Sequence, residues 1–173
     1  AFAELLGRED ALAGISAEYA ASVEQQCSRV QSVVDPGEVL TTIELDGDVA
    51  YVYPPAHDPD GRGLEPLAVP YPFFLECGLQ PSPNLAPQFE GEAFLEVSLE
   101  LLPDFLDDAD HVVIFTEAYE TVDELVAAQP IFEGITAVRG GNAYITPVLT
   151  GANYIGAQER LAAYADVLSG STG

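Results

Sequence analysis

The sequence predicts an α/β fold: a three-layer sandwich with a mostly parallel central sheet flanked by helices, and a long helix in front of it. Three observations lead to this class. They are a helical apolar stripe over the first 35 residues, a hairpin pattern after it, and strands that alternate with helices in the second half. Parallel neighbours need helical crossovers, so the alternation favours a parallel sheet. The length of 173 residues and the apolar share of 48% fit one hydrophobic core.

Residues 9–34 have the pattern of one long amphipathic helix. Apolar residues recur three or four positions apart, at Leu12, Ile15, Tyr19, Val23, Cys27, Val30 and Val34. The sequence Asp35-Pro36-Gly37 ends the helix because proline cannot continue the hydrogen-bond ladder. The β-rich runs 38–45 and 49–53 follow, and the Asp-Gly pair at positions 46 and 47 predicts a hairpin between them.

Proline-rich connectors separate this hairpin from the second half. Residues 54–72 hold six prolines and form a long predicted loop, which leads into a short helix over 71–77. A second connector covers 81–87. Ser98 then has the position of a helix N-cap, with Glu100 in the first turn. The later pattern predicts, in order, a strand at 111–116, a helix at 121–128, a turn at 130–134, a strand at 143–146 and a helix at 153–168.

The residues that follow the predicted strands are the candidate ligand site. In open α/β sheets ligands bind beyond the carboxyl ends of the strands. The candidates in three loops are Tyr53, His57, Asp58, Asp60 and Arg62; Glu117 and Tyr119; and Thr150, Asn153 and Tyr154. Aromatic faces, hydroxyls, an amide and one cation are the mixture that small-molecule sites use. The plainer alternative is core or rim packing for the tyrosines and a merely solvated Arg62.

Motifs for catalysis and metal binding are weak. The chain has no Gly-x-Ser-x-Gly elbow, P-loop or Gly-x-Gly-x-x-Gly sequence, so no catalytic residue and no metal ligand are assigned. A small α/β enzyme that uses Glu117, Asp58 or Asp60 for acid–base work is the alternative function of another class. Residues 57–61 only faintly resemble a metal loop. His111 is expected to be a half-buried residue at a strand end.

The charge balance limits the possible partners. Acidic residues outnumber basic ones 29 to 5, which gives a formal net charge of -24. Such a chain cannot neutralise a phosphate backbone, so nucleic acid is excluded as a partner. A polybasic attachment to anionic lipid is excluded for the same reason. The apolar runs are much shorter than the roughly 20 residues that cross a bilayer, so direct membrane insertion is not expected.

Two cysteines leave two possibilities open. Cys27 lies on the apolar stripe of the first helix, and Cys77 ends the short helix before Gly78, so both thiols are expected to be shielded. They are the candidate pair for one disulfide, which would suit an extracytoplasmic compartment. Two buried free thiols are the alternative.

Several segments resemble one family of transport proteins. The run from Val97 to Pro103 (VSLELLP), followed by Asp110 and the strand 112–115, resembles a segment of the substrate-binding proteins that serve ABC importers of ferric siderophores, cobalamin and haem. Residues 130–132 together with 137–144 are similar to the family's stretch before its last strand and helix. The segments also come in the family's order.

The resemblance implies an organisation and a site. Residues 3–9 look like the start of the helix that links the family's two lobes, so 1–35 would be the interlobe linker helix and 36–173 the C-terminal ligand-binding lobe. An N-terminal lobe would then be absent from this chain. The ligand would lie in a cleft between the lobes, and Glu100 matches the carboxylate that meets arginines of the membrane permease. The protein would act outside the cytoplasm, in a periplasm or lipid-anchored at the outer face of the cell membrane.

The ligand class follows less directly. The resemblance implies an Fe(III)-siderophore complex as the bound ligand, with no intrinsic cofactor. Arg62 is the only arginine in the cleft segments, so a neutral or cationic hydroxamate chelate fits better than a trianionic catecholate. Haem or cobalamin is the alternative within the family, with His57 as the axial ligand of a haem. A structural module that interacts through an acidic face is a third interpretation.

Overall fold

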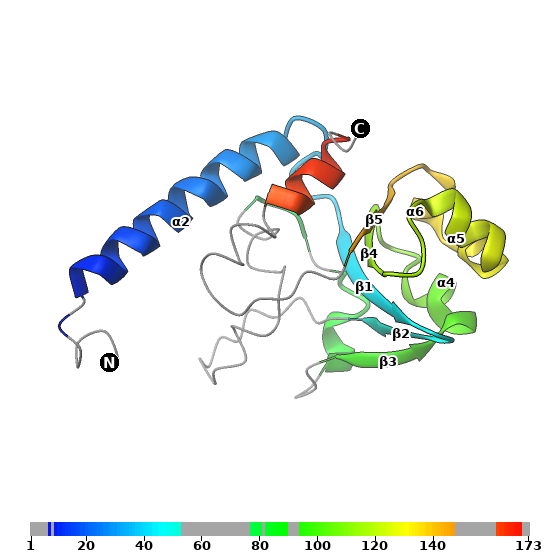
Figure 1. Ribbon diagram of the computed structural model, residues 1–173. Coiled ribbons are helices and arrows are strands. Elements are labelled where there is room, and N and C mark those ends of the chain that lie inside the picture. Colours follow the sequence, from blue (N-terminus) through cyan, green and yellow to red (C-terminus); the bar gives the residue numbers. More distant parts are fainter. Residues whose placement is uncertain are drawn as a thin grey trace.

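Figure 1 shows the computed structural model, which describes residues 7, 9–52, 77–80, 82–89, 94–147 and 162–170. The strands are β1 (Leu40–Asp46), β2 (Val49–Val52), β3 (Leu95–Ser98), β4 (His111–Phe115) and β5 (Ala143–Thr146). The α-helices are α2 (Glu9–Val30), α4 (Leu102–Phe105), α5 (Val122–Ala128) and α6 (Thr136–Arg139). Three 3-10 helices are η1 (Ala86–Phe89), η2 (Leu99–Leu101) and η3 (Pro130–Gly134). Residues 162–168 are helical as well.

The described strands form one mixed sheet in the order β3-β2-β1-β4-β5. β1 lies at its centre, parallel to β4 on one side and antiparallel to β2 on the other; β4 is also parallel to β5, and β3 is antiparallel to β2. The predicted α/β class is therefore confirmed, with a parallel half and an antiparallel half. The sequence pattern does not predict β3, because this short edge strand alternates apolar with polar residues and has only four positions.

The predicted hairpin joins β1 to β2. Asp46 pairs with Val49, which leaves Gly47 and Asp48 as a two-residue loop. Gly47 has a φ of 61°, the left-handed conformation that a type II′ turn requires at its first central position. Glycine adopts this conformation without steric cost, so the sequence fixes the register of the hairpin.

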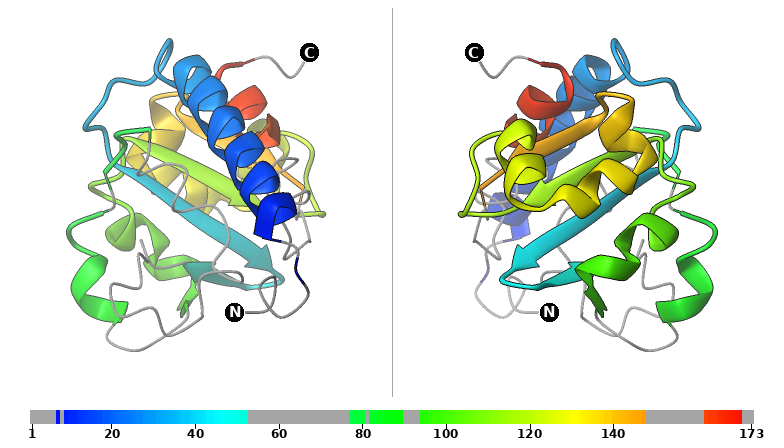
Figure 2. Two further views of the ribbon diagram at one scale, coloured as in Figure 1. Left: turned by 90° about the vertical axis from the view of Figure 1, so that its left-hand side faces the viewer. Right: turned by 90° about the vertical axis from the view of Figure 1, so that its right-hand side faces the viewer.

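Two layers of helices cover the sheet. In Figure 2, α2 stands in front of the sheet from one side, and the α5–α6 region stands in front of it from the opposite side. Successive residues of β4 point alternately to the two layers: Val112 and Ile114 belong to the apolar core under α4, α5 and α6, and Val113 and Phe115 to the core under α2. We call these the α5 face and the α2 face.

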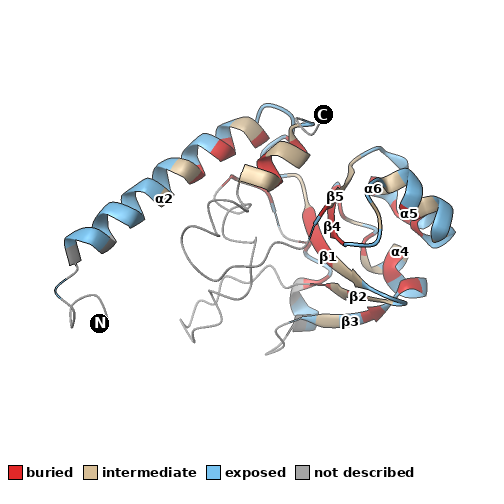
Figure 3. Cartoon of the chain, viewed as in Figure 1, coloured by how far each residue is buried: buried red, intermediate tan, exposed pale blue. Residues whose placement is uncertain are grey.

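The helix α2 is shorter than the sequence predicts and only partly covered. It ends at Val30 rather than at residue 34, because the carbonyl of Val30 accepts hydrogen bonds from the backbone N–H groups of both Val33 and Val34, which tightens the last turn ahead of Pro36. Figure 3 shows the N-terminal part of α2 as exposed and buried residues only near its C-terminal end. The described positions from 10 to 22 are exposed or half-buried.

The helix starts differ in how well sequence rules describe them. α5 begins with a capping box, in which the Thr121 hydroxyl accepts from the Glu124 N–H (3.2 Å) and the Glu124 carboxylate accepts from the Thr121 N–H (3.3 Å). Ser98 does precede η2, but its side chain makes no capping hydrogen bond. Glu100 lies in that first turn as predicted. The predicted helix at 71–77 and the first part of the helix at 153–168 lie outside the described residues.

Cys27 and Cys77 form a disulfide across a sequence separation of 50 residues. This confirms the candidate pair and rules out the alternative of two free thiols. Both residues are buried in the α2 face, at 7% and 1% exposure. Among the described residues, no helix is long and apolar enough to span a membrane.

Candidate functional site

The carboxyl edge of the parallel strands gathers one group of candidate residues. Phe115 pairs with Glu44 of β1 and with Thr146 of β5, so these three strands end at the same edge. β2 runs in the opposite direction, and Val52 is level with Ile43 in the middle of β1. The end of β2 therefore does not reach this edge, and strand order gives no reason to place the loop after it there.

Six predicted site residues lie outside the described part of the chain. They are Tyr53, His57, Arg62, Thr150, Asn153 and Tyr154. Their place in the site stays a prediction, as does the proposed axial role of His57. The described candidates are Glu117 and Tyr119.

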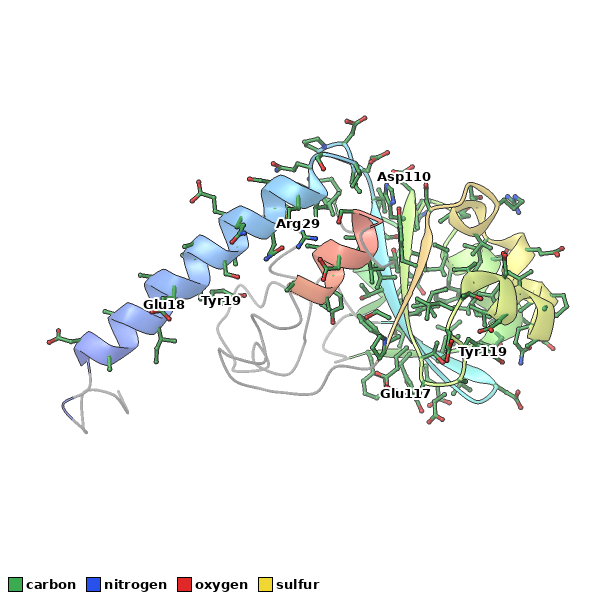
Figure 4. The ribbon with its side chains drawn as sticks, turned by 45° about the horizontal axis from the view of Figure 1, so that its top comes forward. Glu18, Tyr19, Arg29, Asp110, Glu117 and Tyr119 are labelled. Atoms are coloured by element: carbon green, nitrogen blue, oxygen red, sulfur yellow. A yellow bond between two sulfur atoms is a disulfide. The ribbon has the colours of Figure 1, made fainter. Side chains whose placement is uncertain are left out.

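The loop from β4 to α5 presents these two residues. Thr116 is buried, and its hydroxyl accepts a hydrogen bond from the Ala118 N–H (3.1 Å), which bends the chain directly after the strand. Glu117 is exposed, and Tyr119 packs its ring partly against the core of the α5 face. Figure 4 shows both side chains on this loop, at the lower side of the sheet. The structure thus brings Glu117 and Tyr119 together, as the sequence predicts.

An open depression of about 650 Å³ lies between this loop and α5. Its lining residues are Glu117, Ala118, Tyr119, Glu120, Glu124, Ala127 and Ala128. The Glu124 carboxylate is already engaged, since it accepts the N–H groups of Glu120 (2.9 Å) and Thr121 in the capping box. Glu117 and Glu120 are the other two acidic residues of the lining, and no described lining residue is basic.

This depression can accept a neutral or cationic group against a tyrosine ring, and it disfavours an anion. The sequence analysis missed the other lining residues, which are Ala118, Glu120, Glu124, Ala127 and Ala128. Helical spacing could have found Glu124, Ala127 and Ala128, because positions three and four apart on a helix share a face; Glu120 precedes α5 and carries no such signal.

Glu100 lies on another surface. It is exposed in η2, where the buried neighbours Leu99 and Leu102 fix the turn that presents it. Leu101 beside it is 50% exposed. Its exposure therefore allows contact with a partner, and Glu100 does not line the depression at the β4–α5 loop.

His111 is more buried than the sequence suggests. The prediction of a half-buried residue is wrong: His111 is 4% exposed, because Tyr144 stacks beside its ring. Its Nε2 lies 3.1 Å from a Glu38 carboxylate oxygen, and its Nδ1 lies 3.3 Å from the Tyr144 hydroxyl. Burial first, and the charge of Glu38 second, raise the pKa of Tyr144. This cluster lies at the amino end of β4, away from the candidate site.

Within the described residues there is no group of three or more His, Cys, Asp or Glu side chains placed to hold a metal ion.

Comparisons with known proteins identify the fold. No family model and no curated protein matches the sequence. Solved structures do match. A periplasmic binding protein of the FhuD fold family from Bacillus subtilis, a component of a Fep/Fec-like ferrichrome ABC transporter, superimposes with a TM-score of 0.69 at 20% identity, over 96% of this chain and 60% of that one.

Two further structures contain ligands. PiaA from Streptococcus pneumoniae in complex with ferrichrome matches with a TM-score of 0.69 at 17% identity, over 98% of this chain and 55% of that one. FhuD2 from Staphylococcus aureus with bound ferrioxamine B matches with a TM-score of 0.66 at 14% identity, over 99% and 62%. The chain spans 55% to 62% of the length of these three structures. It has the fold of one lobe of a siderophore-binding protein.

Proposed function

We propose that this chain is a non-catalytic binding lobe that captures a ferric siderophore, or a related metal chelate, for an ABC importer. The observation that carries the proposal is the match of nearly the whole chain to about three fifths of proteins that bind ferrichrome or ferrioxamine B. Identities of 14% to 20% leave the ligand open, so its chemistry must be argued from this chain's own residues.

We further propose that residues 1–35 link this lobe to a second lobe and that residues 36–173 form the ligand-binding lobe itself. Two observations support this division. The exposed N-terminal part of α2 extends beyond the sheet, and it starts on the same lower side of the molecule as the arrowhead of β1 (Figure 1). A second lobe attached ahead of α2 would then face the carboxyl edge, with the β4–α5 loop at the boundary.

The bound chelate should be neutral or cationic. The depression at this edge contains three glutamates and Tyr119, and the whole chain has a formal charge of -24. A trianionic chelate would be repelled at such an edge unless several cations offset the charge. A carboxylate-rich edge and an aromatic face therefore favour an uncharged or positively charged hydroxamate complex.

The cellular location follows from the same function. The disulfide between Cys27 and Cys77 supports an extracytoplasmic protein, because disulfides persist in oxidising compartments. Delivery to a permease would use the surface around Glu100. An exposed carboxylate beside an exposed Leu101 can pair with an arginine of the permease and shield that pair from water.

Titration with defined chelates tests the proposal. The chain has eight tyrosines and no tryptophan, so quenching of tyrosine fluorescence reports binding. The complete two-lobed protein should bind ferrioxamine B or ferrichrome and should reject a trianionic catecholate complex. The matched variants are Glu117→Gln, expected to weaken binding of the cationic chelate, and Glu133→Gln, an exposed glutamate outside the depression, expected to leave binding unchanged. If no ferric chelate of any charge binds, the proposed function is wrong.

The docking position needs a separate assay. Glu100→Arg in the complete protein should reduce uptake of the chelate into cells and leave its affinity in solution unchanged, because Glu100 does not line the depression. Uptake at the wild-type level would show that Glu100 is not part of the docking surface.

A further inference from the structure

The anchorage of α2 on the sheet is short. Its buried residues are Val23, Gln26, Cys27 and Val30, all in the C-terminal part of the helix. Ahead of them, Ile15 is on the same stripe but 43% exposed. Tyr19 packs partly against the same core one turn earlier, so among the described residues the packing contacts of this 22-residue helix are concentrated in its C-terminal half.

The anchor itself joins three segments that are remote in sequence. The core of the α2 face contains Val23, Cys27, Val30 and Val34, the segment residues Cys77 and Leu79, and Tyr164, Ala165 and Leu168 of the last helix. Each segment contributes only a few side chains. Because no single segment buries a large apolar surface of its own, packing alone holds each segment only weakly against the other two.

The polar ties within the anchor are weak. Arg29 forms an ion pair with Asp166, but the two side chains are 33% and 44% exposed, and exposed pairs contribute little. The Gln31 side-chain amide donates to the Cys77 carbonyl (2.9 Å). The disulfide is the one covalent tie between α2 and the rest of the anchor among the described residues.

The segment that carries Cys77 is in turn fixed to the sheet. The Gln80 N–H donates to the Glu38 carbonyl (2.8 Å), and the Leu40 N–H donates to the Gln80 carbonyl (2.9 Å), directly at the start of β1. The Gly37 N–H donates to the Gly78 carbonyl (2.9 Å). A bond to Cys77 is therefore a bond to the sheet itself.

We propose that the Cys27–Cys77 disulfide is a positioning element: it sets the direction in which α2 leaves the lobe. The expected effect of the disulfide on ligand affinity rests on the proposed function. If α2 connects two lobes, its direction sets the geometry of the cleft between them, and the disulfide affects ligand affinity although it lies at the end of α2 far from the ligand edge. Preorganised geometry raises affinity by lowering the ordering cost of binding.

Hydrogen exchange of this chain tests the claim that the disulfide fixes α2 on the sheet. In Cys27→Ser/Cys77→Ser, amide exchange should rise roughly tenfold or more in residues 23–34 and 162–168 through local opening, under conditions where β4 and α5 stay protected; any rise in β4 and α5 should be only that expected from the loss of global stability, which denaturant unfolding measures separately. Reduction of the wild-type chain with a phosphine should give the same pattern. Exchange in α2 that rises no more than the loss of global stability requires, or no rise in α2, would overturn the proposal.

The affinity of the complete protein for the chelate tests the claim that the direction of α2 affects binding. The double serine variant should bind the chelate roughly tenfold more weakly at a temperature well below its melting point. Leu106→Ala, which lowers stability through the opposite face and lies outside α5 and the depression, should retain wild-type affinity. Equal affinity of the serine variant and the wild type would refute a positioning role. Absence of binding by the wild type would instead refute the proposed function, and the exchange pattern would still stand.

Discussion

The two faces of the sheet are covered in different ways. The α5 face is built from segments close in sequence: α4, α5, η3 and α6 all lie between residues 102 and 139. The α2 face is built from pieces near residues 27, 78 and 165. Closing long loops costs more entropy than closing short ones, and only the α2 face carries a disulfide and a long-range ion pair among the described residues. Local connectivity thus stabilises one face, and covalent attachment the other.

The largest expected effect concerns the α5 face. Phe132 is fully buried in its core, so Phe132→Ala should cost about 3–5 kcal/mol in free energy of unfolding. Denaturant unfolding followed by circular dichroism measures this. The substitution should leave the disulfide formed and the anchor of α2 intact. A loss well below this range would show that the α5 face is not one continuous core.

Removal of the disulfide should have the next largest effect. Constraint of the unfolded chain by a bond across 50 residues stabilises a protein by typically 2–4 kcal/mol. Cys27→Ser/Cys77→Ser should lose about that much. The matched control is Val33→Ala on the same segment, which is exposed and should change stability by less than about 0.5 kcal/mol. Equal effects of the two changes would contradict the account of the α2 face.

The capping box of α5 should contribute less. Thr121→Ala removes the hydroxyl that accepts the Glu124 N–H and should cost about 1 kcal/mol. Thr121→Ser keeps that acceptor and should retain most of the stability. Since α5 borders the depression, Thr121→Ala should also loosen the β4–α5 loop, which hydrogen exchange at Glu120 and Thr121 can measure.

Alkaline pH should lower the free energy of unfolding through Tyr144, which packs against the core of the α2 face. The pKa of Tyr144 is raised in the folded state by burial and by Glu38. The folded protein therefore holds the phenol proton more tightly than the unfolded chain. This contribution is complete below the unfolded pKa, near 10, and falls as the pH rises above it. Unfolding measured between pH 9 and about 11 should show the loss, and Tyr144→Phe should reduce it. If the free energy of unfolding falls equally with pH in the wild type and in Tyr144→Phe, ionisable groups other than Tyr144 cause the loss.

The ion pair between Arg29 and Asp166 should contribute least. Its side chains are partly exposed, so Arg29→Gln should cost at most about 0.5–1 kcal/mol, and less at high salt. A cost above that of disulfide removal would mean that charge, rather than the covalent bond, fixes α2 on the sheet.

Sequence reasoning worked where a local pattern determines the outcome. The Asp-Gly pair predicts the β1–β2 hairpin because glycine alone adopts the turn's conformation without cost, and the apolar spacing of α2 places Cys27 inward, beside its partner. The spacing does not predict which turns of α2 are buried, because Ile15 belongs to the same stripe as Val23 and is nevertheless exposed. The apolar spacing shows that the helix is amphipathic, but it does not show how many turns of the helix pack against the core.

The candidate site was harder to predict because its position depends on strand direction. Glu117 and Tyr119 follow a parallel strand and do meet at the predicted edge. Tyr53 follows β2, and the rule for carboxyl ends of parallel strands does not apply to a strand that the hairpin makes antiparallel. Glu120 and Glu124 line the same depression because the Glu124 carboxylate accepts the Glu120 N–H (2.9 Å), a contact that the helix pattern alone does not predict for a residue ahead of α5.

The measurement that most directly tests the central claim is hydrogen exchange of the complete protein with and without ferrioxamine B. The account predicts that the chelate slows exchange in the β4–α5 loop around Glu117 to Glu120, and leaves the amino edge around His111 unchanged. Slowed exchange at the amino edge with no change at the loop would contradict a ligand site at the carboxyl ends of the parallel strands.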